Sequence, residues 1–370
     1  MDFQVFIKPA GPDCNLACKY CYYRDKQSLY TDSKVGIMSD HLLEKYICDL
    51  ASASAGNDVF FAWHGGEPTL AGLDFFRKVT GLQKKLIDPG KNIINGIQTN
   101  ATLLDEDWCR FLADENFLVG ISVDGPEEIH DKFRTYSDSK GSFLKTMKGY
   151  DLLRKFNVKT EILTVVSQVN ENHPEEVYDF LRKTGTGFIT FLPLVYISAG
   201  VISGMSVNSE AFGTFLVKVF DRWILQDIGK IKIQIIEEAL RTSFGQDHTL
   251  CIFKKTCGGV PVIERNGDYF CCDHYVDHAH FGGNIMDRTL GEMLASRLQS
   301  DFGQAKKNTL PSYCLECEVL EMCNGECPKN RFIATPDGEA GLNYLCSGYR
   351  KFFNHIHPFA EAVAEAWKRS

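Results

Sequence analysis

The stretch Cys14-Asn15-Leu16-Ala17-Cys18-Lys19-Tyr20-Cys21 places three cysteines within eight residues, with three and then two residues between them. It follows Val5–Lys8, a short apolar run that predicts a strand. In proteins that alternate strands and helices, the segments after the strands meet at the edge of the sheet where ligands bind. The three thiols are therefore expected in a loop on the functional face.

Around this loop, the first 200 residues alternate short apolar runs with amphipathic helical patterns. The apolar runs predict six strands, at residues 5–8, 59–63, 92–99, 117–123, 161–166 and 188–195. Such alternation is typical of parallel strands joined by right-handed helical crossovers. Because six repeats fall short of the eight that close a full barrel, we predict an α/β fold with a partial (β/α)6 barrel. A doubly wound sheet is the alternative.

The pattern changes after residue 203. Helices are expected at 212–225 and 231–244, and Asn266-Gly267 between two apolar runs predicts a hairpin with a type I′ turn. Most of the chain from there to residue 349 reads as loops with cysteines, and the last twenty residues read as a helix. We therefore predict a barrel domain over 1–240, a loop-rich domain over 241–350, and a helix over 351–370 that packs on the barrel.

Composition excludes several classes of function. Among 370 residues, 48 are acidic and 40 are basic, for a net charge of −8, so no basic surface is expected for nucleic acid. The longest apolar run, Phe188–Ile197, has about half the length of a membrane span. The N-terminal residues lack the basic and apolar regions of a signal peptide. We expect a cytoplasmic protein that binds neither nucleic acid nor a membrane.

The 14 cysteines form two groups near the two ends of the chain. In a reducing compartment, clustered cysteines more often bind metal than form disulfides. Three thiolates can hold three irons of a 4Fe–4S cluster and leave the fourth iron open, whereas a zinc site with a distant histidine or three core thiols are the alternatives. The second group offers eight more thiols, enough for two four-cysteine sites of zinc or iron–sulfur type: Cys251, Cys257, Cys272, Cys314, Cys317, Cys323, Cys327 and Cys346. Of the other three, Cys48 and Cys109 are expected to be core thiols, and Cys271 is left unassigned.

The Cys-x3-Cys-x2-Cys pattern of Cys14, Cys18 and Cys21, with Tyr20 before its last cysteine, resembles the signature of the radical SAM enzymes. The resemblance implies that the open iron chelates S-adenosylmethionine. Its reductive cleavage would give a 5′-deoxyadenosyl radical, which abstracts a hydrogen atom from an unactivated carbon.

The same resemblance assigns a cofactor site. Gly65-Gly66-Glu67-Pro68 alone is an ordinary turn, but it resembles the family's site for the methionine amino group. Ser122 and Arg134 would reach the ribose and carboxylate, and Tyr20 and Val195 the adenine region. Without the resemblance, these four would be taken as packing or surface residues.

The second cysteine group resembles the C-terminal SPASM extension, which carries two auxiliary 4Fe–4S clusters. By that resemblance, the first cluster would be held by Cys251, Cys257, Cys272 and Cys327. The second would be held by Cys314, Cys317, Cys323 and Cys346. The chain would then carry three 4Fe–4S clusters in all.

Over nearly its whole length, the chain resembles the anaerobic sulfatase-maturating enzymes, in segments that include Ile7-Lys8-Pro9, Gly65–Leu70, Gln98-Thr99-Asn100, Phe117–Pro126 and Asn343-Tyr344-Leu345-Cys346. The resemblance implies oxidation of a cysteine or serine, in a Cys/Ser-x-Pro-x-Arg motif of an unfolded sulfatase polypeptide, to Cα-formylglycine. The radical would act at Cβ, and a flavodoxin or ferredoxin would supply electrons.

This chemistry requires a base near the substrate side chain. Asp273, beside Cys272, is the candidate, although a turn carboxylate is the plainer reading. Tyr23 and Gln98 match positions that line the family's substrate pocket, or are structural. Two other hypotheses stay open: a SPASM maturase that crosslinks a ribosomal peptide through thioether or C–C bonds, and a non-catalytic protein stapled by zinc.

Overall fold

The computed structural model describes residues 3–29, 36–198 and 200–369. The chain divides into two compact units that interleave along the sequence. The first unit comprises Met1–Ser122, Phe133–Thr160 and Gly258–Gly303. The second comprises Val123–Lys132, Glu161–Cys257 and Gln304–Ser370.

The sheet of the first unit has the strand order β12-β11-β10-β1-β2-β3-β4. Strand β1 pairs in parallel with β2 and with β10, and β2, β3 and β4 continue the parallel part. Strands β10, β11 and β12 pair antiparallel. The strands are β1 Phe6–Ile7, β2 Asp58–Trp63, β3 Asn92–Thr99, β4 Leu118–Ser122, β10 Val262–Ile263, β11 Asp268–Phe270 and β12 Phe281–Asn284.

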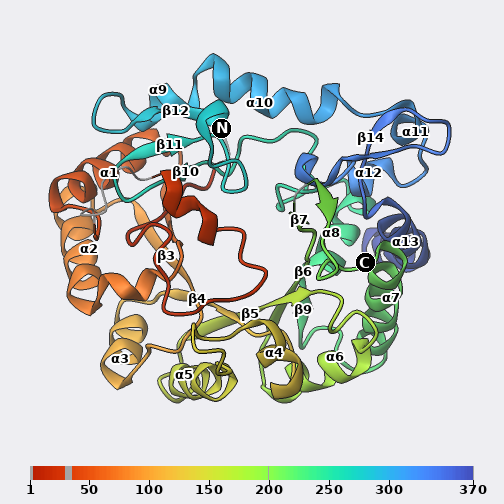
Figure 1. Cartoon of the computed structure of the whole chain (residues 1–370), viewed down its shortest axis with the longest axis horizontal. Coiled ribbons are helices and arrows are strands. Elements are labelled where there is room, and N and C mark those ends of the chain that lie inside the picture. Colours follow the sequence, from red (N-terminus) through yellow and green to blue (C-terminus); the bar gives the residue numbers. More distant parts are fainter. Residues whose placement is uncertain (1–2, 30–35, 199, 370) are drawn as a thin grey trace. The chain divides into compact units, whose positions relative to one another are not determined.

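Helices of the first unit cover one face of these strands, and the chain after β1 lies on the other face (Figure 1). Their apolar residues recur at helical spacing, as an amphipathic helix on a sheet requires. Ser39 caps α1 by accepting a hydrogen bond from the Leu42 amide, and Asp105 caps α3 in the same way through Trp108. The elements are η1 Arg24–Leu29, α1 Asp40–Ala53, η2 Pro68–Ala71, α2 Leu73–Leu86, α3 Glu106–Asp114, α5 Phe143–Lys155, η3 His278–His280 and α9 Leu290–Leu294.

An aromatic cluster around Trp63 fixes β2 against these helices. The Trp63 ring contacts Tyr46 of α1 and Phe76 of α2 edge-on, and all three side chains are buried. The Trp63 indole donates to Asn95 of β3 at 2.9 Å, and Gln83 of α2 donates to the same oxygen at 2.9 Å. Each buried amide is therefore paired, and the end of β2 is held in place.

The second unit has parallel strands in the order β5-β6-β9. Its strands are β5 Lys159–Val166, β6 Phe188–Pro193 and β9 Lys232–Ile233, with small hairpins β7 Ile197–Ser198 and β8 Val201–Ile202, and β13 Ile333–Ala334 and β14 Ala340–Leu342. Its helices are α6 Pro174–Lys183, α7 Ser209–Gln226, α8 Gln234–Ser243, α11 Ser312–Leu315, α12 Leu320–Cys323, η4 Pro328–Asn330 and α13 Cys346–Arg369. Helices α4 Glu127–Phe133 and α10 Arg297–Asn308 each begin in one unit and end in the other.

The predicted alternation of strands and helices over the first 200 residues is confirmed. The bounds match to the residue for β3 and for the helices that the apolar spacing predicts at about 73–86 and 174–183, which are α2 and α6. Three details were wrong. Residues 232–233 form a strand before α8, and α9 and α10 occupy part of the stretch expected to be loops. The thiol of Cys48, expected in the core, is exposed, whereas Cys109 is buried.

The predicted hairpin forms, but with a different turn. A type I′ turn needs a positive φ at both central residues, and of the pair Asn266-Gly267 only Gly267 has one, at 91°. The Glu264 amide donates to the Asp268 carbonyl at 2.9 Å, and the Gly267 amide donates to the Glu264 carbonyl at 2.8 Å. The loop therefore has three residues and ends in a left-handed glycine, which is the other common hairpin solution.

Helix α13 packs closely on α7 where two glycines face each other. A Cβ atom on Gly348 would lie 2.1 Å from the Ser209 carbonyl oxygen, and one on Gly213 would lie 2.6 Å from the Gly348 oxygen. We expect Gly348→Ala to lower the free energy of unfolding by about 1–3 kcal/mol, because the helices must separate. The measurement is anaerobic urea unfolding followed by circular dichroism.

The matched control is Gly81→Ala in α2, where nothing lies within 4 Å of the added methyl group. Alanine there should be neutral or stabilise by up to about 1 kcal/mol. Equal stability of the Gly348→Ala protein and the wild type would contradict the close helix crossing.

Candidate functional site

The three-cysteine loop follows β1, and backbone hydrogen bonds hold it in the first unit. The amides of Ala17 and Lys19 donate to the carbonyls of Thr135 and Phe133 at 2.7 and 2.9 Å. Burial raises the pKa of Cys14 to about 12, and the charges of Glu67, Cys18 and Cys21 act in the same direction. The three thiols therefore lie within electrostatic reach of one another, and they need a cation if all three are to ionise together.

The Gly65-Gly66 turn lies against the residues just before Cys14. The Gly66 amide donates to the Gly11 carbonyl and the Glu67 amide to the Asp13 carbonyl, both at 2.8 Å. A Cβ atom on Gly66 would lie 2.2 Å from the Asp13 oxygen, so no other residue fits there. The predicted cofactor turn and the predicted cluster loop thus form one packed structure.

The carboxylate of Glu67 is buried and accepts hydrogen bonds through both of its oxygens. One oxygen accepts from the Thr69 amide and from the hydroxyls of Thr69 and Thr99, at 2.6–3.0 Å. The other oxygen accepts from the Asn100 amide at 2.8 Å. Burial raises the pKa of Glu67, and these hydrogen bonds oppose that rise. Its side chain therefore ties the end of β2 to the end of β3, and the cofactor-binding role expected of Glu67 stays a prediction.

Two other predicted residues meet at the ends of β3 and β4. The side-chain amide of Gln98 donates a hydrogen bond to the Ser122 hydroxyl at 3.0 Å. The guanidinium of Arg134 lies over the ring of Tyr20, 5.4 Å from its centre, and that ring packs on Phe133. Val195 follows β6 in the second unit. The roles of these residues toward S-adenosylmethionine and substrate stay predictions.

Asp273 lies in a buried charged group of the first unit that the sequence did not disclose. Its carboxylate pairs with the ammonium group of Lys8 and accepts a hydrogen bond from the Tyr22 hydroxyl. Burial alone would raise the pKa of Asp273, but the positive charges of Lys8 and His274 and these hydrogen bonds outweigh it and hold that pKa well below its usual range. Asp273 is therefore an ionised acceptor at neutral pH.

The neighbouring residue Tyr23 faces a different partner. Its hydroxyl donates to the carboxylate of Glu264, and the Lys8 ammonium lies 3.5 Å from the centre of its ring. His64 stacks on Phe6 with the ring centres 3.8 Å apart, and burial together with the Lys8 charge lowers its pKa to about 3. Lys8 and Tyr22 were not identified as site residues from the sequence. A lysine at the end of the apolar run Val5–Lys8 was the one signal in the sequence that pointed to Lys8.

In the second unit, one pocket is lined by the four cysteines predicted to hold the second auxiliary cluster: Cys314, Cys317, Cys323 and Cys346. Burial raises the pKa of Cys323 to about 12, and the charges of Glu326, Cys346 and Cys314 add to that rise. Burial likewise raises the pKa of Cys346 to about 11, with Cys314 and Cys317 contributing. The four thiols therefore form one set.

Three of the four cysteines predicted for the first auxiliary cluster also lie in the second unit. Burial raises the pKa of Cys251 to about 11, with Cys257 among the neighbouring charges, and the pKa of Cys327 to about 12, again with Cys257 nearby. The fourth, Cys272, belongs to the first unit. Cys271, the residue before Cys272, is buried, and its carbonyl accepts a hydrogen bond from the side-chain amide of Gln299 at 3.1 Å.

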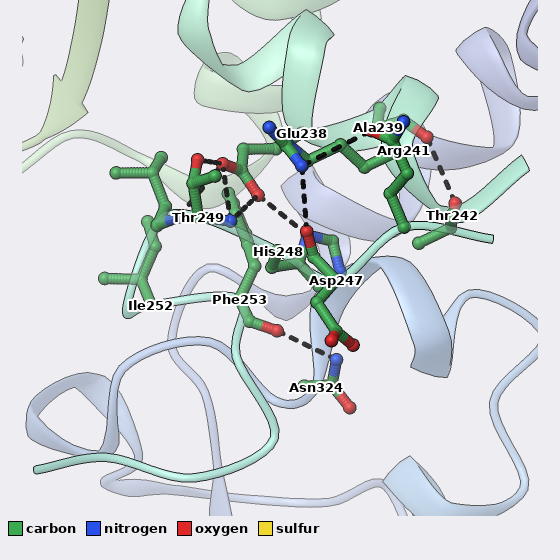
Figure 2. A network of polar contacts seen from close by, with 12 residues as sticks. Glu238, Ala239, Arg241, Thr242, Asp247, His248, Thr249, Ile252, Phe253 and Asn324 are labelled. Atoms are coloured by element: carbon green, nitrogen blue, oxygen red, sulfur yellow. Dashed lines mark hydrogen bonds and ion pairs between the residues drawn. The ribbon is translucent and has the colours of Figure 1, made fainter. Parts of the chain in front are cut away.

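A polar network, shown in Figure 2, holds the loop that carries Cys251. Glu238 of α8 accepts from the amides of Thr249 and Leu250 at 3.1 and 2.9 Å and lies 2.8 Å from His248 Nδ1. His248 Nε2 donates to the Glu321 carbonyl at 2.9 Å, two residues before Cys323. This network therefore ties the loop of one cysteine set to the segment of the other.

The donor sets fit iron–sulfur clusters in their chemistry. A 4Fe–4S cluster takes its protein ligands as separate thiolates, one to an iron. Among the described residues, no three or more His, Cys, Asp or Glu side chains are arranged for a single metal ion. The fit rests on the composition of the sets, since each is made of cysteines whose neighbouring thiols are near enough to affect their pKa values.

Comparison with known families agrees with this geometry. Residues 9–181 match the radical SAM superfamily, and residues 257–318 match an iron–sulfur cluster-binding domain named SPASM. The serine-type anaerobic sulfatase-maturating enzyme of Bacteroides thetaiotaomicron is 42% identical over 96% of this chain and 90% of its own length. The chain belongs to the anaerobic sulfatase-maturating enzymes. A cysteine-type member, from Clostridium novyi, is 34% identical over 94% of both chains.

Solved structures of this family extend the agreement to the fold. "Native anSMEcpe with bound AdoMet" matches with a TM-score of 0.88 and 32% identity, over 98% of this chain and 99% of that one. The same protein with a bound peptide, Kp18Cys, matches equally well, at a TM-score of 0.88 and 32% identity over the same shares of both chains. The predicted fold class and the three-cluster and S-adenosylmethionine cofactor set are thereby confirmed. In the described part of the chain, no helix combines the length and apolar character needed to cross a bilayer.

The packing of Gly66 generates a prediction for cofactor binding. In Gly66→Ala the methyl group would overlap the Asp13 oxygen, so the turn and the cysteine loop must move apart. If the cost of overpacking, about 1–3 kcal/mol, falls on the cofactor-binding geometry, the affinity for S-adenosylmethionine should fall about 5- to 150-fold. Anaerobic equilibrium dialysis with labelled cofactor measures the affinity, and iron analysis is run in parallel.

Gly56→Ala is the control, because an added methyl group there meets nothing within 4 Å. It should bind the cofactor as the wild type does. Wild-type affinity in the Gly66→Ala protein would show that this turn does not shape the cofactor site.

Proposed function

We propose that this protein oxidises one cysteine or serine of an unfolded sulfatase polypeptide, within a Cys/Ser-x-Pro-x-Arg motif, to Cα-formylglycine. The observation that carries the proposal is the buried ionised carboxylate of Asp273, in the same unit as the three-cysteine loop. Its context is a chain whose relatives include serine-type and cysteine-type sulfatase-maturating enzymes. Neighbouring structures with bound peptide support a peptide substrate.

Within this function the chain's own residues have separate tasks. When bound, S-adenosylmethionine and the clusters supply hydrogen-atom removal from the substrate Cβ and accept the second electron. Gly65 and Gly66 offer backbone atoms to the cofactor, and Ser122, Arg134, Tyr20 and Val195 complete its site. Their side chains are expected to orient the cofactor rather than to react.

Asp273 has the proton-transfer task. Its Oδ atoms would accept the proton of the substrate thiol or hydroxyl, while Lys8 and Tyr22 keep the carboxylate ionised and fixed. A carboxylate with a low pKa is a weak base, but it suffices here, since loss of an electron makes the substrate proton far more acidic. Tyr23 and Gln98 would position the peptide.

The cellular setting is part of the proposal. We infer that a flavodoxin- or ferredoxin-type protein reduces the clusters and that the reaction takes place in the cytoplasm, before the sulfatase folds. The arginine of the target motif suits a chain with a net charge of −8. The predicted domains, 1–240 for S-adenosylmethionine chemistry, 241–350 for auxiliary clusters and 351–370 for the terminal helix, are part of the same proposal.

The function is tested with the reconstituted protein, S-adenosylmethionine, dithionite and a short peptide that carries the motif. The serine peptide should lose the mass of two hydrogen atoms, and the cysteine peptide should exchange the elements of hydrogen sulfide for one oxygen atom. Mass spectrometry follows the peptide, and chromatography follows 5′-deoxyadenosine. Formation of 5′-deoxyadenosine with no change in either peptide would contradict the proposal and favour a crosslinking maturase.

The role of Asp273 is tested by Asp273→Asn. Because a positioned base contributes about 10²–10⁴-fold, formylglycine formation should fall at least about 100-fold while cluster content and S-adenosylmethionine cleavage persist. Asp287→Asn, an exposed aspartate of the same unit, is the control and should leave turnover unchanged. Wild-type turnover by Asp273→Asn would remove this residue from the reaction.

A further inference from the structure

Two cations, one fully buried and one half-buried, lie among the cysteines of the second unit. Lys306, in the last turn of α10, has no exposed surface, and its ammonium group donates to the carbonyls of Cys251 and Ile252 at 2.9 and 2.7 Å. Arg331, just after η4, is half-buried. Its guanidinium donates to the Lys306 carbonyl at 2.6 Å, which joins the two cations in one structure.

Neither cation forms an ion pair with a carboxylate of the described residues; their hydrogen bonds go to backbone carbonyls. Arg331 donates to the carbonyls of Gly325 and Asn324 at 2.8 and 2.9 Å. A buried charge that lacks a counter-charge is costly. Glu326 supplies one negative charge near both cations, and the thiolates of bound clusters would supply more.

The two cations differ in the cysteine sets that they approach: Lys306 lies beside the first set, and Arg331 lies between cysteines of both. The Lys306 ammonium group donates to the backbone of Cys251 and of the residue after it, so Lys306 lies beside the first set. The Arg331 guanidinium donates to the carbonyl of Asn324, next to Cys323 of the second set, and at 3.2 Å to that of Glu326, next to Cys327 of the first. Arg331 is therefore within electrostatic reach of cysteines from both sets.

One buried anion, Glu326, lies in the same region and acts in the opposite sense. Its carboxylate accepts hydrogen bonds from Asn330 and Asn343 at 3.0 and 2.6 Å and has 2% of its surface exposed. It precedes Cys327 directly, and its charge raises the pKa of Cys323. The protein therefore holds charges of both signs at fixed positions around the thiol sets.

We propose that Lys306 and Arg331 raise the reduction potentials of the two auxiliary clusters, and that Glu326 lowers them. A fixed positive charge stabilises the more negative, reduced state of a nearby cluster, and a fixed negative charge destabilises it. Arg331 acts on both clusters and Lys306 on the first. The consequence is a pair of clusters poised to accept the substrate's electron. The inference rests on the proposed function only in requiring that these cysteines bind clusters.

The experiment is a redox titration of the full-length chain, followed by electron paramagnetic resonance. Cys14, Cys18 and Cys21 are changed to alanine in every sample so that only the auxiliary clusters give a signal. In this background, Lys306→Met and Arg331→Gln should each lower the ratio of reduced to oxidised cluster about 10-fold at a fixed potential. For a one-electron couple this is a shift of about 59 mV.

Two further variants separate charge from packing. Arg331→Lys keeps the positive charge, so the potentials of both clusters should stay close to those of the parent protein. Glu326→Gln, which keeps the side-chain shape, should move the potentials in the opposite direction, upward. Shifts whose sign follows the charge that was removed, with Arg331→Lys close to the parent protein, point to charge rather than packing, so this comparison decides the matter even if Lys306→Met loses iron.

The outcomes separate this inference from the proposed function. About eight irons per chain in the parent protein, with potentials unmoved by Arg331→Gln and Glu326→Gln, would overturn the inference and leave the function intact. A parent protein without these irons would overturn the inference together with the auxiliary clusters. Shifts of opposite sign for the cation and anion variants would establish it.

Discussion

The buried carboxylate of Glu67 joins the ends of β2 and β3, and the geometry of the three-cysteine loop depends on it. Its oxygens satisfy Thr69, Thr99 and the amide of Asn100. Asn100 in turn donates to Asn15 at 3.0 Å and approaches the Cys14 sulfur at 3.8 Å. With Gly66 packed on Asp13, a few residues fix the cluster loop relative to the strands. Radical chemistry needs this rigidity, because the reacting atoms must meet in one geometry.

Buried charge is the second constraint on this protein. In the first unit, Asp273 is ionised because Lys8 and Tyr22 compensate for its burial. In the second unit, Lys306 and Arg331 have no carboxylate partner among the described residues and lie beside thiols instead. Both arrangements hold a fixed charge at a place where the proposed reaction transfers a proton or an electron. In the proposed reaction, the proton would go to a carboxylate that is already ionised, and the electron would go toward cysteine sets that lie beside two fixed cations.

Much of the fold could be predicted from the sequence because the α/β repeat leaves a strong periodic signal. The bounds of α2 and β3 follow directly from their apolar residues and polar ends. Helix α10 was missed because its residues are mostly polar, and the hairpin at Gly267 took its other common turn. The cysteine sets were predictable because most of their members lie close together in the sequence, and the resemblance to the family assigned each cysteine to a set.

The partners of Asp273 were not predictable in this way. Tyr22 lies 251 positions away along the chain and meets Asp273 only in the folded first unit. No local pattern distinguishes it from Tyr23, whose hydroxyl instead faces Glu264. The same holds for Lys306 and Arg331, since a lysine in a polar helix reads as exposed until its neighbours are known. Long-range pairing of buried charge is therefore the information that the structure adds to the sequence.

The most direct test of the account follows a hydrogen atom. A substrate peptide deuterated at the Cβ of its target serine is incubated with reconstituted protein, S-adenosylmethionine and reductant, and the 5′-deoxyadenosine is analysed by mass spectrometry. The account predicts that deuterium from Cβ appears in 5′-deoxyadenosine in proportion to the formylglycine formed. Formylglycine accompanied by 5′-deoxyadenosine without deuterium would contradict it.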